Sequence, residues 1–215
     1  KMLPLGFEPN ITHKVLARWE AEGKLLAVVT QNIDGLHQKA GSRNVCELHG
    51  SVLRNYCTRC GAFHSAEFIR DSEGIPRCHC GGIVKPDVVL YEESLNGDTI
   101  ERSVSAIERA DLLLFSYPVY TFIAPCQLHR FIELMKEHGV CVTEKIATQI
   151  TTSKHFYDVT AHRYIQDNCQ EMGINFIRGL SADMEDLITK KGQKQAVDFW
   201  NHFCWCVEKK YFEPA

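Results

Sequence analysis

The sequence predicts an α/β protein built on a Rossmann-like parallel sheet with helices on both faces. Apolar runs of strand length recur along the chain, and each is followed by a stretch with helical spacing of its apolar residues. Residues 25–29 form the clearest of these runs, and the polar side chains Gln31, Asn32, Asp34 and His37 follow it closely. Open α/β sheets bind ligands at the carboxyl ends of their strands, so these residues are candidates for a site.

The first half of the chain offers several element boundaries. Residues 10–22 are expected to form a helix, because Pro9 precedes them and Gly23 ends them. A strand over 25–30 follows, then a helical turn at 35–40, a strand at 45–48, an extended apolar segment at 86–91 and a helix through Ala110. Asp98 and Glu101 are expected to form a capping box for that last helix.

The second half continues the alternation of strand and helix. Strands are expected at residues 112–115, 145–150 and 175–177, and helices at 127–137, 159–172 and 193–209. Such alternation indicates parallel strands joined by helical crossovers.

Composition limits the classes of function. A chain of 215 residues can hold one large domain or two small ones, and a net charge of -3 is not the footprint of a nucleic-acid-binding protein. The longest uncharged run, residues 112–128, is interrupted by Ser116, Pro118 and Pro125, which argues against a transmembrane helix. With no signal peptide evident, the ten cysteines suggest a reducing compartment, and we expect a cytoplasmic protein with neither nucleic-acid nor membrane partners.

Four cysteines have the spacing of a metal site. Cys57 and Cys60 form a C-x-x-C pair, Cys78 and Cys80 form a C-x-C pair, and 17 residues separate the pairs. This spacing predicts a small zinc-ribbon insert over residues 51–85, with a structural Zn²⁺ because four thiolates leave no open position. Two unrelated clusters of reduced cysteines are the alternative, and His79 could replace one ligand. The other six cysteines are expected to be ordinary thiols.

A second motif lies between the first strand and the insert. His49 follows a short predicted strand in Glu47-Leu48-His49-Gly50, and imidazole is the natural general base near neutral pH. A single histidine is more often structural, and Asn32 and Asp34 are also common turn residues.

The patterns T-Q-N-I-D-G-L-H and E-L-H-G closely resemble the sirtuins, the NAD-dependent protein-lysine deacylases, over about residues 1–110. The resemblance implies NAD⁺ as cosubstrate and an acylated-lysine protein or peptide as substrate. It implies that His49 deprotonates a ribose hydroxyl after nicotinamide has left, and that Gln31, Asn32 and Asp34 bind the nicotinamide ribose and carboxamide. Segment 85–93 resembles the part that pairs with the substrate backbone, which assigns substrate binding to Val88, Val89 and Leu90. Residues 1–50 and 86–110 would then form part of a Rossmann domain around the insert.

Two glycine-rich loops of that family have no counterpart in this sequence. The G-A-G-[IV]-S loop belongs before the point at which the chain begins, so we expect a truncated chain with little deacylase activity of its own. In place of the G-T-S loop the sequence has Ser116-Tyr117-Pro118. Without these loops no phosphate cradle is evident.

From about residue 111 the chain resembles flavodoxin-like FMN-dependent oxidoreductases. Pro118, Val119 and Tyr120 resemble one flavin-contacting loop, and Thr152 and Ser153, within 151–155, resemble another. Two ordinary βα loops are the alternative interpretation. The hypotheses that compete with a deacylase are therefore an FMN-binding NAD(P)H oxidoreductase and a catalytically inactive zinc-containing binding module.

Overall fold

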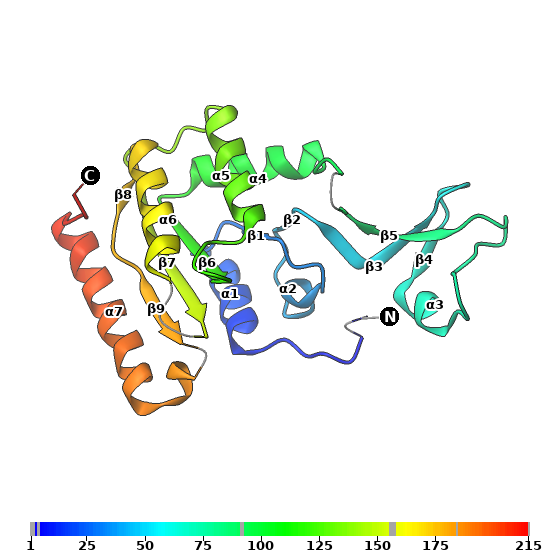
Figure 1. Ribbon diagram of the computed structural model, residues 1–215, viewed down its shortest axis with the longest axis horizontal. Helices are drawn as coiled ribbons and strands as arrows, with labels where there is room; N and C mark the ends of the chain where they lie inside the picture. Colours follow the sequence, from blue (N-terminus) through cyan, green and yellow to red (C-terminus); the bar gives the residue numbers. More distant parts are fainter. Residues whose placement is uncertain (1–2, 4, 91–92, 155–157, 184, 215) are drawn as a thin grey trace. The chain divides into compact units, whose positions relative to one another are not determined.

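The computed structural model describes residues 3, 5–90, 93–154, 158–183 and 185–214 (Figure 1). The chain divides into two compact units, Lys1–Ala106 and Ile107–Ala215, which are described separately below. Four residues covered by the sequence predictions, namely Lys1, Tyr91, Glu92 and His155, lie outside the described residues.

The first unit opens with a helix and a pair of parallel strands. Helix α1 (Ile11–Ala21) begins where predicted, because the Asn10 side chain accepts a hydrogen bond from the His13 N–H and caps it. Strand β1 (Val28–Thr30) pairs in parallel with β2 (Val45–Glu47), in a register that places Thr30 beside Glu47. The short helix α2 (Leu36–Lys39) lies between these two strands in the chain.

The insert contains more regular structure than its sequence indicates. An antiparallel sheet has the order β4-β3-β5, from β4 (Phe63–Ser65), β3 (Gly50–Cys57) and β5 (Val84–Val88), and helix α3 (Ala66–Asp71) follows β4. The sequence predicted none of β3, β4 and α3. The strands carry little apolar alternation of their own, and cross-strand pairing defines them.

Helix α4 (Gly97–Arg109) confirms the next predicted helix but corrects its cap. The Asn96 side chain accepts hydrogen bonds from the Thr99 N–H at 3.0 Å and the Thr99 hydroxyl at 3.2 Å. The cap is thus Asn96, two residues before the predicted Asp98, because an amide oxygen at this position reaches the free N–H groups of the first turn.

The second unit is built on a parallel sheet with β7 at its centre. Strand β7 (Ile146–Ser153) pairs in parallel with β6 (Leu112–Pro118) on one side, and with β8 (Asn175–Phe176) and β9 (Leu180–Asp183) on the other. The sequence did not predict β9. Helices α5 (Cys126–Glu137), α6 (Val159–Glu171) and α7 (Lys190–Lys209) and the 3-10 turn Asp186–Ile188 complete the unit.

The core of the second unit explains why these helices form. Ile132 and Met135 of α5, Ile165 of α6, and Phe176 and Ile177 near β8 are almost completely buried. Helix α6 contacts β7 and β8, and α7 contacts β9. The predicted α/β class with parallel strands is confirmed, although the parallel strands form two sheets, one in each unit.

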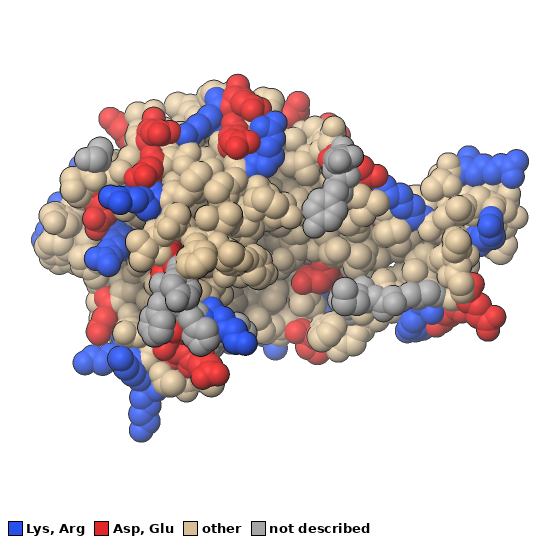
Figure 2. All heavy atoms as spheres, viewed as in Figure 1, with Lys and Arg blue, Asp and Glu red and all other residues tan. Residues whose placement is uncertain are grey.

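Lys and Arg side chains are interspersed with Asp and Glu on the face drawn in Figure 2. Among the described residues, no helix is both long enough and apolar enough to cross a bilayer.

Candidate functional site

The parallel pair β1–β2 brings the two sequence motifs of the first unit to one edge. Thr30 and Glu47 are partners in register, and the Leu48 N–H donates to the Thr30 carbonyl at 2.9 Å. The loop that follows Thr30 and the loop that follows Glu47 therefore leave the sheet side by side. Val52 at the start of β3 then donates its N–H to the Ile33 carbonyl at 3.1 Å, which fastens the first loop.

The three predicted cofactor-binding residues lie in that first loop but differ in their contacts. Asp34 accepts a hydrogen bond from the Leu36 N–H at 2.9 Å and so begins α2, as a turn-forming residue would. Asn32 is exposed and Gln31 is half-buried, and neither side chain is hydrogen-bonded to another described residue. The Asn32 and Gln31 amides, and the second Asp34 oxygen, are the groups that remain for a ligand.

His49 is held through its backbone, which leaves its ring available. Its carbonyl accepts a hydrogen bond from the Val89 N–H at 3.1 Å, and the next residue, Gly50, pairs with Val88. The imidazole makes no hydrogen bond to the described residues and is only partly buried. Such a ring can accept a proton from a bound molecule.

The predicted substrate segment lies directly against His49. Val88 ends β5, and Val89 and Leu90 continue in extended form, with Leu90 54% exposed. The Leu90 N–H donates to a Glu93 carboxylate oxygen at 2.9 Å, and Lys85 pairs with the same carboxylate at 2.6 Å. The structure thus brings the candidate base and the candidate substrate strand together through one backbone hydrogen bond.

His37 is a second, half-buried histidine of this region. Burial lowers its pKa, the nearby His13 lowers it further, and Asp34 and Glu47 oppose the shift. The two histidine rings lie 4.7 Å apart, and the His37 Nδ1 atom is buried with no hydrogen-bond partner among the described residues.

Sequence reasoning missed Arg54, which lies between the two halves of the site. Its Nη1 donates to Glu47 Oε2 at 2.7 Å and its Nε donates to Asp87 Oδ2 at 2.8 Å. Burial acts to lower the pKa of Arg54, but the hydrogen bonds to both carboxylates outweigh it and raise that pKa. No sequence signal marks Arg54, because its partners come from separate strands.

The four predicted metal ligands form a cluster in the first unit. The Sγ atoms of Cys57, Cys60, Cys78 and Cys80 all lie within 4.8 Å of one another, with Cys57–Cys80 at 3.4 Å and Cys60–Cys78 at 3.7 Å. Four sulfurs at tetrahedral Zn–S distances stand about 3.8 Å apart, so this set fits a zinc ion. His79 is outside the group. Backbone N–H groups of Cys60 and Arg59 lower the pKa of Cys57 to about 6, which favours its thiolate.

The two predicted flavin loops of the second unit lie at one end of its sheet. Pro118 of β6 is the register partner of Thr152 of β7, and the Val119 N–H donates to the Thr152 carbonyl at 2.9 Å. Tyr120 is 65% exposed, whereas Ser153 is buried and its hydroxyl donates to Asp183 at 3.3 Å. The two segments thus share one end of the sheet, but the Ser153 hydroxyl is hydrogen-bonded within the protein.

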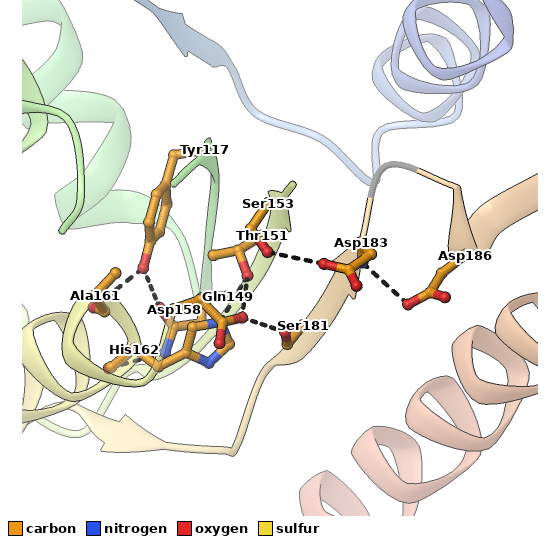
Figure 3. A network of polar contacts seen from close by, with 10 residues as sticks. All are labelled: Tyr117, Gln149, Thr151, Ser153, Asp158, Ala161, His162, Ser181, Asp183 and Asp186. Carbon is orange, nitrogen blue, oxygen red and sulfur yellow. Dashed lines mark hydrogen bonds and ion pairs between the residues drawn. The ribbon is translucent and has the colours of Figure 1, made fainter. Parts of the chain in front are cut away.

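A polar network beneath these loops joins β7 to α6 and β9 (Figure 3). The Tyr117 hydroxyl donates to Gln149 Oε1 at 2.6 Å, and the Thr151 hydroxyl lies 2.7 Å from His162 Nε2. Asp158 accepts hydrogen bonds from Thr151 and from the Ser181 hydroxyl. Members of this network line a groove of about 660 Å³. Because its buried members are hydrogen-bonded to one another, we assign the network a structural role: it holds β7, α6 and β9 together.

Comparisons with known proteins bear on the first unit above all. The model of the Sir2 family matches residues 1–119. An NAD-dependent protein deacetylase of Clostridium perfringens is 57% identical over 115 residues, which is 53% of this chain and 47% of that protein. An NAD-dependent protein deacylase of Aeropyrum pernix is 46% identical over 112 residues, 51% of this chain and 45% of that protein. The chain thus spans about half the length of these curated relatives.

Solved structures give a similar result over a longer part of the chain. A structure described as Sir2 with a p53 peptide and NAD⁺ is 27% identical, with a TM-score of 0.57, and the match covers 79% of this chain and 72% of that chain. A structure described as Sir2 bound to acetylated peptide is 26% identical, with a TM-score of 0.55, covering 79% and 73%.

Proposed function

The chain belongs to the Sir2 family, and from that premise we propose that it carries the base, nicotinamide loop and substrate strand of an NAD-dependent protein-lysine deacylase. The observation that supports this most directly is the meeting of three elements at one place. The loop with Gln31, Asn32 and Asp34, the partly exposed His49 ring, and the extended residues 88–90 are joined by backbone hydrogen bonds.

Each element has a role in this proposal. The amides of Gln31 and Asn32 and the Asp34 carboxylate bind the nicotinamide carboxamide and its ribose, for which they offer both donors and acceptors. Val88, Val89 and Leu90 bind the acyl-lysine peptide as an added strand, whose main-chain hydrogen bonds supply affinity for many sequences. The His49 imidazole takes the proton of a ribose hydroxyl once nicotinamide has left.

Zinc has a structural role in the same proposal. The four cysteines would hold one Zn²⁺ with no open position, so the ion supplies folding free energy and orders the insert over residues 51–85.

Peptide binding tests the proposal without requiring turnover. A fluorescent acetyl-lysine peptide should bind the 215-residue chain, and the same peptide with N-methylated backbone amides beside the lysine should bind far more weakly, because methylation removes strand donors. Equal binding of the two peptides, or of the deacetylated peptide, would contradict substrate capture by residues 88–90. Binding without any turnover, even with a glycine-rich loop segment fused before Lys1, would favour an inactive binding module instead.

Nicotinamide release tests the catalytic role of His49. We expect the chain alone to show little turnover, because it has neither glycine-rich loop of the family. Fusing the preceding segment of the Clostridium perfringens relative before Lys1 supplies the first of these loops; in a fused chain that turns over, His49→Ala should lower turnover by about 10²–10⁴-fold, with peptide affinity retained. His138→Ala in the exposed cap of α5 is the matched control. Equal turnover by the His49 and His138 variants would remove His49 from the mechanism.

FMN binding by the second unit is a second candidate function. One observation favours it: Pro118 ends β6 and is the register partner of Thr152 near the end of β7, so residues 118–120 and 152–153 lie at the same end of adjacent parallel strands. Such an end is where open α/β sheets bind ligands. Purified protein that lacks flavin absorbance, and that does not quench the fluorescence of added FMN, would exclude this candidate.

A further inference from the structure

Strand β3 is interrupted where it passes the candidate site. Ser51 is the register partner of Asp87 on β5, but the next pair in the ladder is Asn55 with Pro86. Residues 52–54 therefore bulge out of the pairing between the two strands. A bulge of this kind weakens the ladder locally, and it re-aims the side chains that it carries.

Arg54 is one of the bulged residues, and its side chain spans the interruption. One nitrogen binds Glu47, two positions before His49, and another binds Asp87, one position before Val88. The Glu47 side chain is only 9% exposed, so Arg54 pairs with a nearly buried carboxylate on this side, whereas the Asp87 side chain is 46% exposed. A planar guanidinium can hold two carboxylates in fixed directions, which a lysine ammonium cannot do.

We infer that Arg54 is a positioning residue that couples the His49 loop to the strand proposed to bind the acyl-lysine peptide; this inference rests on the proposed function. Just before the bulge, backbone links join the His49 motif to β5 and the residue after it: the Val89 N–H donates to the His49 carbonyl, and Gly50 and Ser51 pair with Val88 and Asp87. Arg54 adds two side-chain links to these backbone links, one to Glu47 in the His49 motif and one to Asp87 in β5. It therefore sets the distance between the general base and the backbone that holds the substrate.

Hydrogen–deuterium exchange on the 215-residue chain tests the coupling directly. Arg54→Met keeps the apolar stem but removes both ion pairs, so amides of residues 88–90 should exchange about tenfold faster. Asp87→Asn should produce a similar increase in exchange at residues 88–90. The double variant should exchange little faster than either single variant, because both substitutions break the same Arg54–Asp87 pair. Arg54→Lys should give an intermediate exchange rate, since an ammonium keeps the positive charge but lacks the planar set of donors that binds both carboxylates.

Arg70→Met is the matched control, because it removes an exposed arginine–carboxylate pair of equal length, 2.7 Å from Arg70 Nε to Asp71, in α3. The urea midpoint should fall further in Arg54→Met than in this control, because only Arg54→Met leaves a nearly buried carboxylate, that of Glu47, without its partner. The affinity of the folded protein for the fluorescent acetyl-lysine peptide should fall about tenfold in Arg54→Met and stay unchanged in the control. If Arg54 contributed to stability alone, the two variants would bind the peptide equally under conditions in which both are folded.

The outcomes separate this inference from the proposed function. If the unaltered chain binds the peptide and Arg54→Met binds it equally well, with unchanged exchange at residues 88–90, Arg54 has no positioning role. If the unaltered chain does not bind the peptide, the proposed function fails; faster exchange at residues 88–90 in Arg54→Met would then still show the coupling, whereas unchanged exchange would overturn the inference as well.

Discussion

Replacing Gly50 with alanine tests the close approach of β3 and β5 beside His49. Gly50 has a φ of 73°, in the left-handed region, and a Cβ built on it would lie 2.0 Å from the Asp87 carbonyl oxygen. Alanine therefore faces two penalties: the left-handed backbone, which costs about 1–2 kcal/mol, and an overlap that forces the strands apart. Separation breaks one or two backbone hydrogen bonds, for roughly 1–2 kcal/mol more.

Gly23→Ala isolates the first of these penalties. Gly23 has nearly the same φ, 71°, but a Cβ added there meets nothing within 4 Å. Urea unfolding of the zinc-loaded protein should therefore show a loss of about 1–2 kcal/mol for Gly23→Ala and roughly 2–4 kcal/mol for Gly50→Ala. The excess should also appear as faster amide exchange at Val89, which donates to the carbonyl of His49.

The comparison of the two variants has a clear failing result. If Gly50→Ala and Gly23→Ala lower the unfolding free energy equally, then the close approach of Gly50 to Asp87 costs nothing to relieve. The argument that this glycine sets the spacing beside His49 would then be wrong, whatever the effect on activity.

Three further predictions concern the metal cluster and the second unit. Purified protein should contain about one zinc per chain by metal analysis. Cys60→Ser or a strong chelator should remove the zinc and unfold the insert, with a loss of circular dichroism. Full ellipticity in the absence of zinc would contradict this prediction. Tyr117→Phe should lower the unfolding free energy of the second unit by about 1–3 kcal/mol, because the buried Gln149 oxygen loses its donor; a change near zero would mean that the oxygen finds another. Stability of the second unit should fall as the pH drops below about 6.5. Burial lowers the pKa of His162 and outweighs the opposing effect of Asp158, so the unfolded chain takes up that proton more readily. His162→Gln should flatten the urea midpoint between pH values of about 7.5 and 5.5, and an unchanged slope would exclude His162 as the cause.

Local patterns in the sequence predicted much of the first unit. The C-x-x-C and C-x-C pairs identified the metal cluster because thiolate ligands must converge on one ion whatever the surrounding strands do. The first helix was predicted within a residue at its start, since Asn10 caps its own turn. The capping box at Asp98 was wrong for a related reason, because several polar residues near one helix start can each serve as its cap.

Features that depend on distant strands could not be predicted. Arg54 is one charged residue among many in the sequence, and only the register of β3 with β5 places it between Glu47 and Asp87. Strand β9 was missed because its four residues Leu180–Asp183 include two polar side chains, and pairing with β7 alone makes them a strand. The roles assigned to His49 and to the loop of Asn32 remain predictions.

Strand β3 has a consequence for how a metal could influence this chemistry. It starts at Gly50, adjacent to the proposed base, and ends at Cys57, a member of the metal cluster. Eight residues of extended chain span roughly 23 Å, which is beyond the reach of direct polarisation of a bound substrate. A zinc ion at the cysteines would therefore influence His49 only mechanically: it would fix the position of Cys57 and so restrict the motion of the strand that leads back to His49.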